Sequence, residues 1–251
     1  MWDQYDVSAA APWRPHFGAN TEAPDQGLAF FYNGELDSGS SVESQYMGDK
    51  VKQFLEGMVV LNTTAGTAVN ISTMPIDNGQ PRTRGVIQYI PNYGDNGILV
   101  SFGGTYRPVS EIDANVATNY VDMSEIDIFD ISTLYNGRNA SSGWYKQQAT
   151  GNVPLARGAF CAVTVSAPDN SSHNIYIYGG LNEHSDTYYD DVYVLSLPSF
   201  TWTMMYGPGN SPRFGHTCHV VGNRQMLTVG GISNLDMQCE SRGGRRCIFD
   251  Y

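Results

Sequence analysis

The sequence predicts an all-β fold of the β-propeller class, in which four-stranded blades follow one another along the chain. One unit occurs four times: a strand led by glycine, an apolar strand that ends in glycine, a third apolar strand, and a strand led by tryptophan. The strands are rich in valine, isoleucine, tyrosine and phenylalanine, with glycine, proline, asparagine and aspartate between them. A repeated unit of this length with four strands is typical of a propeller.

The spacing of the repeats supports this prediction. The interval from the leading glycine to the closing glycine is similar in all copies: 18 to 34, 85 to 104, 158 to 180 and 215 to 231. The interval from the tryptophan position to the next leading glycine is also nearly constant: 2 to 18, 69 to 85, 144 to 158 and 202 to 215. The segment between the second and third strands varies most, as a surface loop does.

The elements follow in order from these positions, as three complete four-stranded blades and two partial ones. Residues 1–7 match an isolated fourth strand. Complete blades are predicted at residues 14–74, 81–149 and 154–206, and a blade that stops after its third strand at 212–251. In the first blade Val69 takes the place of tryptophan. The apolar positions 51, 54, 55 and 58 fit a helical stripe, but we interpret them as the lead-in to a strand at Met58.

Glycine doublets and tryptophans are the predicted structural residues of the repeat. A doublet stands where the second strand must stop and turn, because glycine permits a positive φ and a close backbone approach. The doublets are Gly103-Gly104, Gly179-Gly180 and Gly230-Gly231. Trp144 and Trp202 open fourth strands, where a large aromatic side chain can bury against the adjacent blade.

The two ends of the sequence predict an incomplete ring. Trp2–Tyr5 matches a fourth strand without its three partners, and the last blade stops before its outer strand. Propellers usually close with four to eight blades. We therefore expect an open arc that is an internal piece of a longer protein. The alternative is that Trp2–Tyr5 completes the last blade and closes a four-bladed ring.

Charge and hydropathy exclude two classes of partner. The 251 residues carry 14 basic and 25 acidic side chains, a net charge of −11, which repels a phosphate backbone. No nucleic-acid binding is predicted. No apolar run approaches the ~20 residues of a membrane helix, so this segment itself is predicted to make no membrane contact. The first residues also lack the basic and apolar regions of a signal peptide.

Other features favour the secretory pathway. Four sequons offer N-glycosylation sites, at Asn62, Asn70, Asn139 and Asn170. A chain so rich in asparagine, serine and threonine contains about this many by chance, so their number decides nothing. Asn139 and Asn170 fall in polar loops where a glycan can be accommodated.

The four cysteines are open to more than one interpretation. Cys161 and Cys218 each follow a leading glycine by three residues, so they are predicted to occupy equivalent places in successive first strands. Equivalent side chains point the same way, and we expect two small buried hydrophobic residues rather than a disulfide. Cys239 and Cys247 bracket a polar loop and are the possible disulfide. No paired spacing typical of a zinc site is present.

These motifs resemble the kelch repeat over nearly all of residues 14–251. More narrowly, four stretches resemble secreted or surface-anchored kelch proteins of filamentous fungi: Leu155–Cys161, His173–Gly180, Leu195–Trp202 and Pro212–Cys218. The resemblance implies a signal peptide before the propeller and often a membrane anchor after it, both outside this sequence. It also implies an extracellular or cell-surface scaffold that binds a protein or carbohydrate ligand, and it assigns no catalytic residue.

Copper-radical carbohydrate oxidases similar to galactose oxidase share this fold, so a fragment of such an enzyme is the alternative function. Its site needs imidazole and tyrosinate ligands at the ring axis, whereas the five histidines are scattered. His216 and Cys218 share one face of a strand and are the best metal pair, but we expect them to pack the blade. The loop 183–186 crowds an acid, a histidine and a serine, yet adjacency in sequence is not the geometry of a triad. No catalytic residue, metal ligand or cofactor is predicted.

Overall fold

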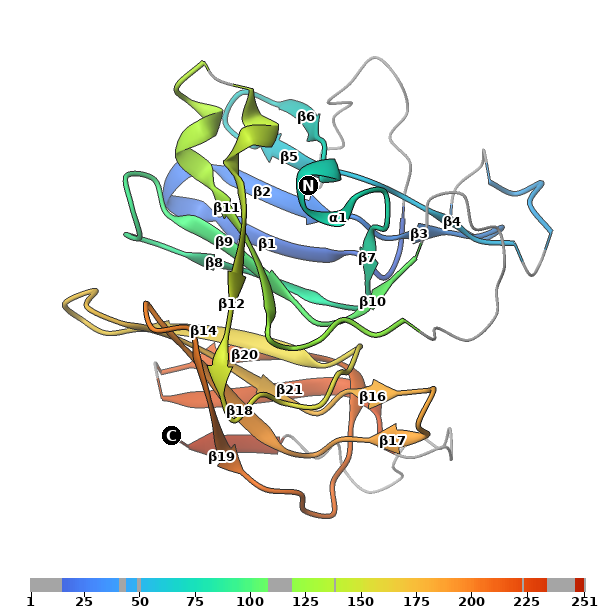
Figure 1. Ribbon diagram of the computed structural model, residues 1–251, viewed down its shortest axis with the longest axis vertical. Helices are drawn as coiled ribbons and strands as arrows, with labels where there is room; N and C mark the ends of the chain where they lie inside the picture. Colours follow the sequence, from blue (N-terminus) through green and yellow to red (C-terminus); the bar gives the residue numbers. More distant parts are fainter. Residues whose placement is uncertain are drawn as a thin grey trace, which may run out of the picture.

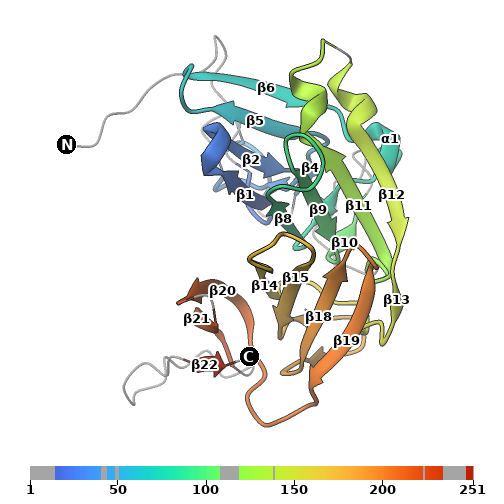
Figure 2. The same ribbon diagram turned by 90° about the vertical axis from the view of Figure 1, so that its left-hand side faces the viewer.

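The computed structural model describes residues 15–40, 44–48, 51–107, 119–137, 139–222, 224–233 and 247–250. In this part of the chain four antiparallel sheets succeed one another, and they fan out along an arc from the blue to the red end of the sequence (Figures 1 and 2). The predicted terminal strand at Trp2–Tyr5, and with it the question of ring closure, lies outside the described residues.

Each of the first three sheets is a meander of four strands in chain order. The first sheet contains β1 (Ala19–Ala23), β2 (Leu28–Tyr32), β5 (Met58–Asn62) and β6 (Thr67–Ile71). The second contains β8 (Val86–Ile90), β9 (Ile98–Phe102), β11 (Glu125–Asp130) and β12 (Trp144–Gln148). The third contains β14 (Cys161–Ser166), β15 (His173–Tyr178), β18 (Val192–Leu197) and β19 (Thr201–Tyr206).

Two features lie outside this regular pattern. The short strand β13 (Thr150–Gly151) adds to the third sheet, parallel to β19. The fourth sheet has three described strands: β20 (Phe214–Val221), β21 (Gln225–Ile232) and β22 (Cys247–Asp250). The first strands β1, β8, β14 and β20 neighbour one another in turn, so they form the inner side of the arc.

The core lies between the sheets rather than within any one of them. One buried cluster joins the first and second sheets, a second joins the second and third, and a third joins the third and fourth. Trp144 lies in the first of these clusters and Trp202 in the second. Trp144 donates from Nε1 to the Ser72 carbonyl oxygen at 3.1 Å, and Trp202 donates to that of Met123 at 2.9 Å. Each ring therefore satisfies its one polar group on the preceding sheet while its apolar surface is buried.

The connections divide the molecule into two faces. A meander places the turns between first and second and between third and fourth strands at one end, which we call the hairpin face. The connections between second and third strands lie at the other end, which we call the loop face. The loop face carries three pairs of short strands: β3 (Glu35–Leu36) with β4 (Gln53–Phe54), β7 (Arg82–Thr83) with β10 (Thr105–Tyr106), and β16 (Leu181–Asn182) with β17 (Thr187–Tyr188) (Figure 1).

Helix is confined to four short segments of the described chain: α1 (Met74–Asp77), η1 (Pro24–Gln26), η2 (Ile131–Leu134) and η3 (Ala140–Gly143). The all-β prediction is confirmed. Phe54 lies in strand β4, so the helical stripe at 51–58 forms no helix. No helix among the described residues is long and apolar enough to cross a membrane.

One position of the first repeat was predicted wrongly. Ala68 pairs with Leu61 as Trp144 pairs with Phe129, so Ala68 and not Val69 occupies the tryptophan position. Val69 points to the opposite face of edge strand β6 and is half exposed. A shift of one residue in a strand reverses the side chain.

Candidate functional site

A ladder of backbone hydrogen bonds joins the inner ends of the blades at the loop face. The Arg84 N–H donates to the Phe17 carbonyl oxygen, the Ala159 N–H to that of Arg84, and the Gly215 N–H to that of Ala159, each at 2.8 Å. All four residues have a positive φ, between 53° and 65°. Three of them are not glycine, although this conformation costs an ordinary residue about 1–2 kcal/mol. The ladder therefore defines structurally equivalent residues in successive repeats.

The ladder shows what the glycine doublets do. An arginine two residues before each of the last three ladder positions donates to the carbonyl oxygen of the first doublet glycine. These bonds run from Arg82 to Gly103 at 3.5 Å, from Arg157 to Gly179 at 3.1 Å, and from Arg213 to Gly230 at 2.5 Å. The second glycine then donates its N–H to the arginine carbonyl of the next blade, from Gly104 to Arg157 at 2.9 Å and from Gly180 to Arg213 at 2.8 Å.

Five of the six doublet positions leave no room for a side chain, and Gly230 faces open space. All six doublet glycines have a positive φ. A Cβ on Gly104 would meet the Thr83 carbonyl oxygen, and one on Gly179 would meet that of Arg213. The doublets therefore join neighbouring blades through backbone hydrogen bonds.

Two of these arginines form buried ion pairs that the sequence analysis missed. The Arg157 side chain is fully buried, and both of its terminal nitrogens donate to the Asp191 carboxylate. Its guanidinium carbon lies 3.7 Å from the centre of the Tyr189 ring. Arg82 pairs with the buried Asp127 at 2.7 Å. Burial raises the pKa of the Asp127 carboxyl, and the charge of Arg82 opposes this shift. The recurrence of arginine at 82, 157 and 213 was the available signal.

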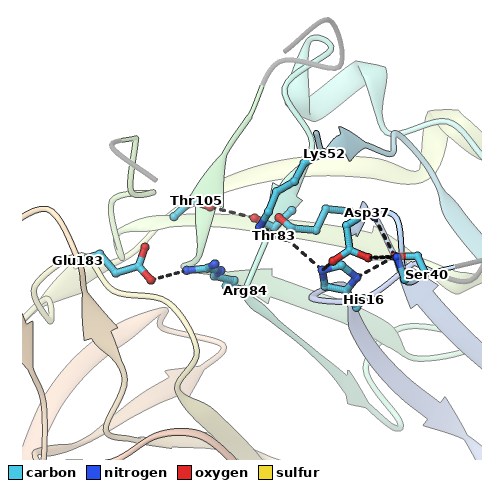
Figure 3. A network of polar contacts seen from close by, with 10 residues as sticks. His16, Asp37, Ser40, Lys52, Thr83, Arg84, Thr105 and Glu183 are labelled. Atoms are coloured by element: carbon cyan, nitrogen blue, oxygen red, sulfur yellow. Dashed lines mark hydrogen bonds and ion pairs between the residues drawn. The ribbon is translucent and has the colours of Figure 1, made fainter. Parts of the chain in front are cut away.

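Side chains from three repeats meet on the loop face, where the ladder begins (Figure 3). The Phe17 ring is 48% exposed, and the Arg84 guanidinium carbon lies 4.8 Å from its centre. Arg84 also pairs with Glu183 at 2.8 Å. The Glu183 backbone N–H donates to the Tyr120 hydroxyl at 2.9 Å. We call Phe17, Arg84, Tyr120 and Glu183 the composite patch, because it exists only while three blades remain adjacent.

A second group beside the patch resembles a catalytic triad in its contacts. His16 Nδ1 lies 3.0 Å from Ser40 Oγ, and His16 Nε2 lies 3.2 Å from Glu35 Oε1. However, Lys52 binds the same Glu35 oxygen at 2.5 Å. The Ser40 hydroxyl lies 3.0 Å from Asp37 Oδ1 and accepts the Asp37 N–H at 2.9 Å, which closes a local turn. These contacts hold the loop after β3 and leave the hydroxyl engaged with Asp37.

The crowded loop at residues 183–186 forms no triad. Glu183 is paired with Arg84, and the His184 backbone is bonded to Asn182. The Ser185 hydroxyl contacts Thr187 at 2.8 Å. These residues form the turn between β16 and β17.

The structure shows that the prediction for Cys161 and Cys218 was wrong. Their sulfurs form a disulfide between β14 and β20, with Cα atoms 5.5 Å apart. The sequence alignment matched Gly158 to Gly215, whereas the ladder matches Ala159 to Gly215. The two cysteines are therefore one residue out of equivalence. Successive side chains of a strand point to opposite faces. Cys161 therefore faces the fourth sheet, and Cys218 faces the third sheet.

His216 lies beside this disulfide and is buried. The sulfurs of Cys161 and Cys218 and a ring nitrogen of His216 all lie within 4.8 Å of one another. Neither ring nitrogen of His216 forms a hydrogen bond of good geometry with the described residues. Burial, with the charge of Arg213, lowers the pKa of His216 to about 4, against a smaller opposing effect of the Tyr178 backbone.

The remaining histidines lie apart from this group in the described structure. His173 is buried at the start of β15, and its Nδ1 lies 2.8 Å from the Ser166 hydroxyl oxygen. His184 and His219 are exposed, and His16 belongs to the loop after β3. They do not bring imidazoles together around the inner strands.

Three of the four predicted glycosylation sites lie on one face. Asn62 ends β5 and its side chain accepts the Ala65 N–H in the turn that follows, Asn139 caps η3 and accepts the Ser141 N–H at 3.2 Å, and Asn170 lies in the turn after β14. All three are on the hairpin face, opposite the composite patch. Asn70 is exposed on edge strand β6. Cys239 lies outside the described residues, as does the side chain of Cys247, so their predicted disulfide stays a prediction.

Residues 97–242, more than half of the chain, match the family profile described as KLHDC2/KLHL20/DRC7 Kelch-repeats domain. The chain belongs to the kelch-repeat family. This kelch chain is 32% identical over 251 residues to a kelch repeat-containing protein of Arthroderma benhamiae, an alignment that covers 90% of the chain and 35% of the relative. It is 26% identical over 124 residues to human Kelch domain-containing protein 3, covering 43% of the chain and 31% of that protein.

The fold is shared more widely than the sequence. The structure of YjhT matches with a TM-score of 0.55 at 11% identity, over 89% of this chain and 60% of that one. This likeness concerns the fold alone. The chain spans about a third of the length of the curated relatives named above. The prediction of a kelch-type propeller similar to a fungal relative is confirmed, and kelch repeats generally mediate protein interactions.

Proposed function

We propose that this kelch domain is a non-catalytic scaffold that binds a partner protein through its loop face. The observation that carries the proposal is the composite patch, an exposed aromatic ring beside a guanidinium, built from three successive repeats. A few residues supply most of the binding energy in protein interfaces, and aromatic residues and arginine are enriched at these interfaces. The patch offers both, held on a backbone that does not need to rearrange.

Rigidity is the second support. Phe17 and Arg84 form hydrogen bonds of the backbone ladder, so their Cα positions are fixed by the contacts that join the blades. A pre-organised surface loses less conformational entropy on binding than a mobile loop. Glu183 and Lys52 place charges of both signs around the aromatic ring, which favours a partner segment of mixed polarity.

We further propose that the protein acts outside the cell or at its surface. Glycans at Asn62, Asn139 and Asn170 would cover the hairpin face and leave the loop face free. The Cys161–Cys218 disulfide supports an oxidising compartment, because such bonds are rare in the cytosol. Expression in a secreting eukaryotic host, followed by enzymatic removal of N-glycans and mass spectrometry, tests occupancy of the three sites.

Binding is tested by presenting the purified chain to an array of peptides and oligosaccharides. We expect peptide ligands whose signal is lost in Phe17→Ala and in Arg84→Ala and is kept in Tyr145→Ala, which removes an equally exposed aromatic side chain from outer strand β12. Oligosaccharide signals lost in the same two variants would identify a carbohydrate partner instead. Binding that survives both substitutions would refute the loop face as the site. A fluorophosphonate probe should leave Ser40 unlabelled, and labelling of Ser40 would contradict the non-catalytic proposal.

A further inference from the structure

We propose that Cys161, His216 and Cys218 form a redox-gated site for one thiophilic cation, which we take to be Zn²⁺, between the third and fourth sheets. In the oxidised protein the two sulfurs share a disulfide. In the reduced protein the two thiolates and the imidazole bind the cation. Both forms cross-link the same two blades.

The first support is the position of the three donor atoms. They come from facing strands, Cys161 from β14 and His216 with Cys218 from β20, and they all lie within 4.8 Å of one another. Zinc binds sulfur at about 2.3 Å and imidazole nitrogen at about 2.0–2.1 Å in a tetrahedron, so its donors lie roughly 3.5 Å apart. Small side-chain rotations reach that separation once the sulfur–sulfur bond is broken.

The second support is His216 itself. The residue is 6% exposed, and neither ring nitrogen forms a hydrogen bond of good geometry with the described residues, although the Tyr178 backbone is close enough to favour the charged ring. A buried polar group without a partner is destabilising and uncommon in native proteins. The disulfide alone gives this imidazole no role. A cation between the sulfurs and the ring provides one nitrogen with a ligand bond.

The chemistry of the two states balances. A reducing dithiol supplies two electrons and two protons, which cleave the disulfide into two thiols while the dithiol becomes a disulfide. Binding of Zn²⁺ then releases both thiol protons, and the two thiolates neutralise the charge of the cation in a buried place. Cys218 is only half buried, so solvent reaches the site, and water can serve as the fourth ligand.

The experiment uses the full 251-residue chain with Cys239→Ser and Cys247→Ser, which remove the two other thiols. After reduction with a phosphine and anaerobic desalting, Co²⁺ is added as a spectroscopic probe. We expect uptake of one equivalent, with the thiolate-to-cobalt charge transfer and strong visible bands of a tetrahedral sulfur site, and displacement by Zn²⁺. Omission of the phosphine should abolish uptake.

Variants then assign the ligands. His216→Ala should weaken cobalt binding by at least about tenfold, since loss of even an outer-shell partner costs that much, and Cys161→Ser should abolish the charge-transfer band. His219→Ala, an exposed histidine on the same strand, is the matched control and should bind as the parent does. X-ray absorption of the zinc-loaded parent gives a measurement that needs no ligand variant, and we expect two sulfur donors and one imidazole. Absence of cobalt uptake, or equal uptake by His216→Ala, would overturn the proposal.

Discussion

Replacement of Arg157 by alanine should destabilise the domain more than any surface substitution. The guanidinium is fully buried, bonds the Gly179 carbonyl oxygen at 3.1 Å and that of Leu155 at 3.0 Å, and neutralises Asp191. Its removal leaves a buried carboxylate without a counter-charge, a change that costs about 3–5 kcal/mol. For a domain of this size that loss lowers the melting temperature by roughly 6–20 °C, at 2–4 °C per kcal/mol. Thermal and urea unfolding followed by circular dichroism measure both quantities.

A less buried pair supplies the control: Arg84 of the second repeat and Glu183 of the third, whose side chains are 18% and 33% exposed. Arg84→Ala breaks the ion pair with Glu183, which is partly exposed, so its cost should stay below about 1 kcal/mol. The double variant Arg157→Ala with Asp191→Asn should recover part of the loss, because it removes the unpaired charge. An Arg157→Ala cost no larger than that of Arg84→Ala would refute the assignment of Arg157 as a buried cross-link.

Three further predictions concern the seams between blades. Gly179→Ala combines a positive φ with a clash against the Arg213 carbonyl oxygen and should cost about 2–5 kcal/mol, whereas Gly222→Ala, with a φ of 60° and open space, should cost about 1–2 kcal/mol in urea unfolding. Cys161→Ser opens a disulfide with a sequence separation of 57 and should cost about 4 kcal/mol; a melting temperature that is equal in the parent and the variant would show that the bond does not form. The folded pKa of His216, about 4, lies below the unfolded value of about 6.5, so the unfolded state binds more protons between them. Stability should therefore fall as the pH drops from about 6.5 to about 4, by up to about 3 kcal/mol, and His216→Leu should remove that part of the pH dependence.

The fold was predictable because each repeat carries its own copy of the same signals. Glycine doublets, tryptophans and apolar strands recur, so one ambiguous copy is corrected by the others. The first repeat shows the limit of this redundancy. Without a tryptophan, a register error of one residue placed Val69 where Ala68 stands, since both are small apolar residues in an edge strand.

The contacts between blades were less predictable than the blades. The alignment on Gly158 and Gly215 was wrong by one residue, because the left-handed ladder position is occupied by Ala159 in one repeat and by Gly215 in the next. That single residue decides which face a side chain occupies. It therefore decided whether Cys161 and Cys218 could meet, and the sequence alone did not reveal which residue carries the positive φ. The composite patch was hidden for a related reason, since Phe17, Arg84 and Glu183 are brought together only by blade packing.

The ladder separates stability from binding in a way that can be tested at one structural position. Phe17, Arg84 and Ala159 are non-glycine residues held at a positive φ, where the fourth repeat has Gly215. Ala159 has a small side chain that plays no part in the composite patch. Ala159→Gly relieves its backbone strain and should stabilise the domain by about 1 kcal/mol in urea unfolding without changing partner binding.

Arg84→Gly relieves the same strain but removes the guanidinium from the composite patch. Its stability should stay close to that of the parent, because the gain offsets the loss of a partly exposed ion pair, whereas its binding to the array ligands should be lost. The strained side chains at Phe17 and Arg84 would then be retained for recognition rather than for folding. If Arg84→Gly binds as the parent does, the side chain at this ladder position serves the fold alone, and the partner must occupy another surface.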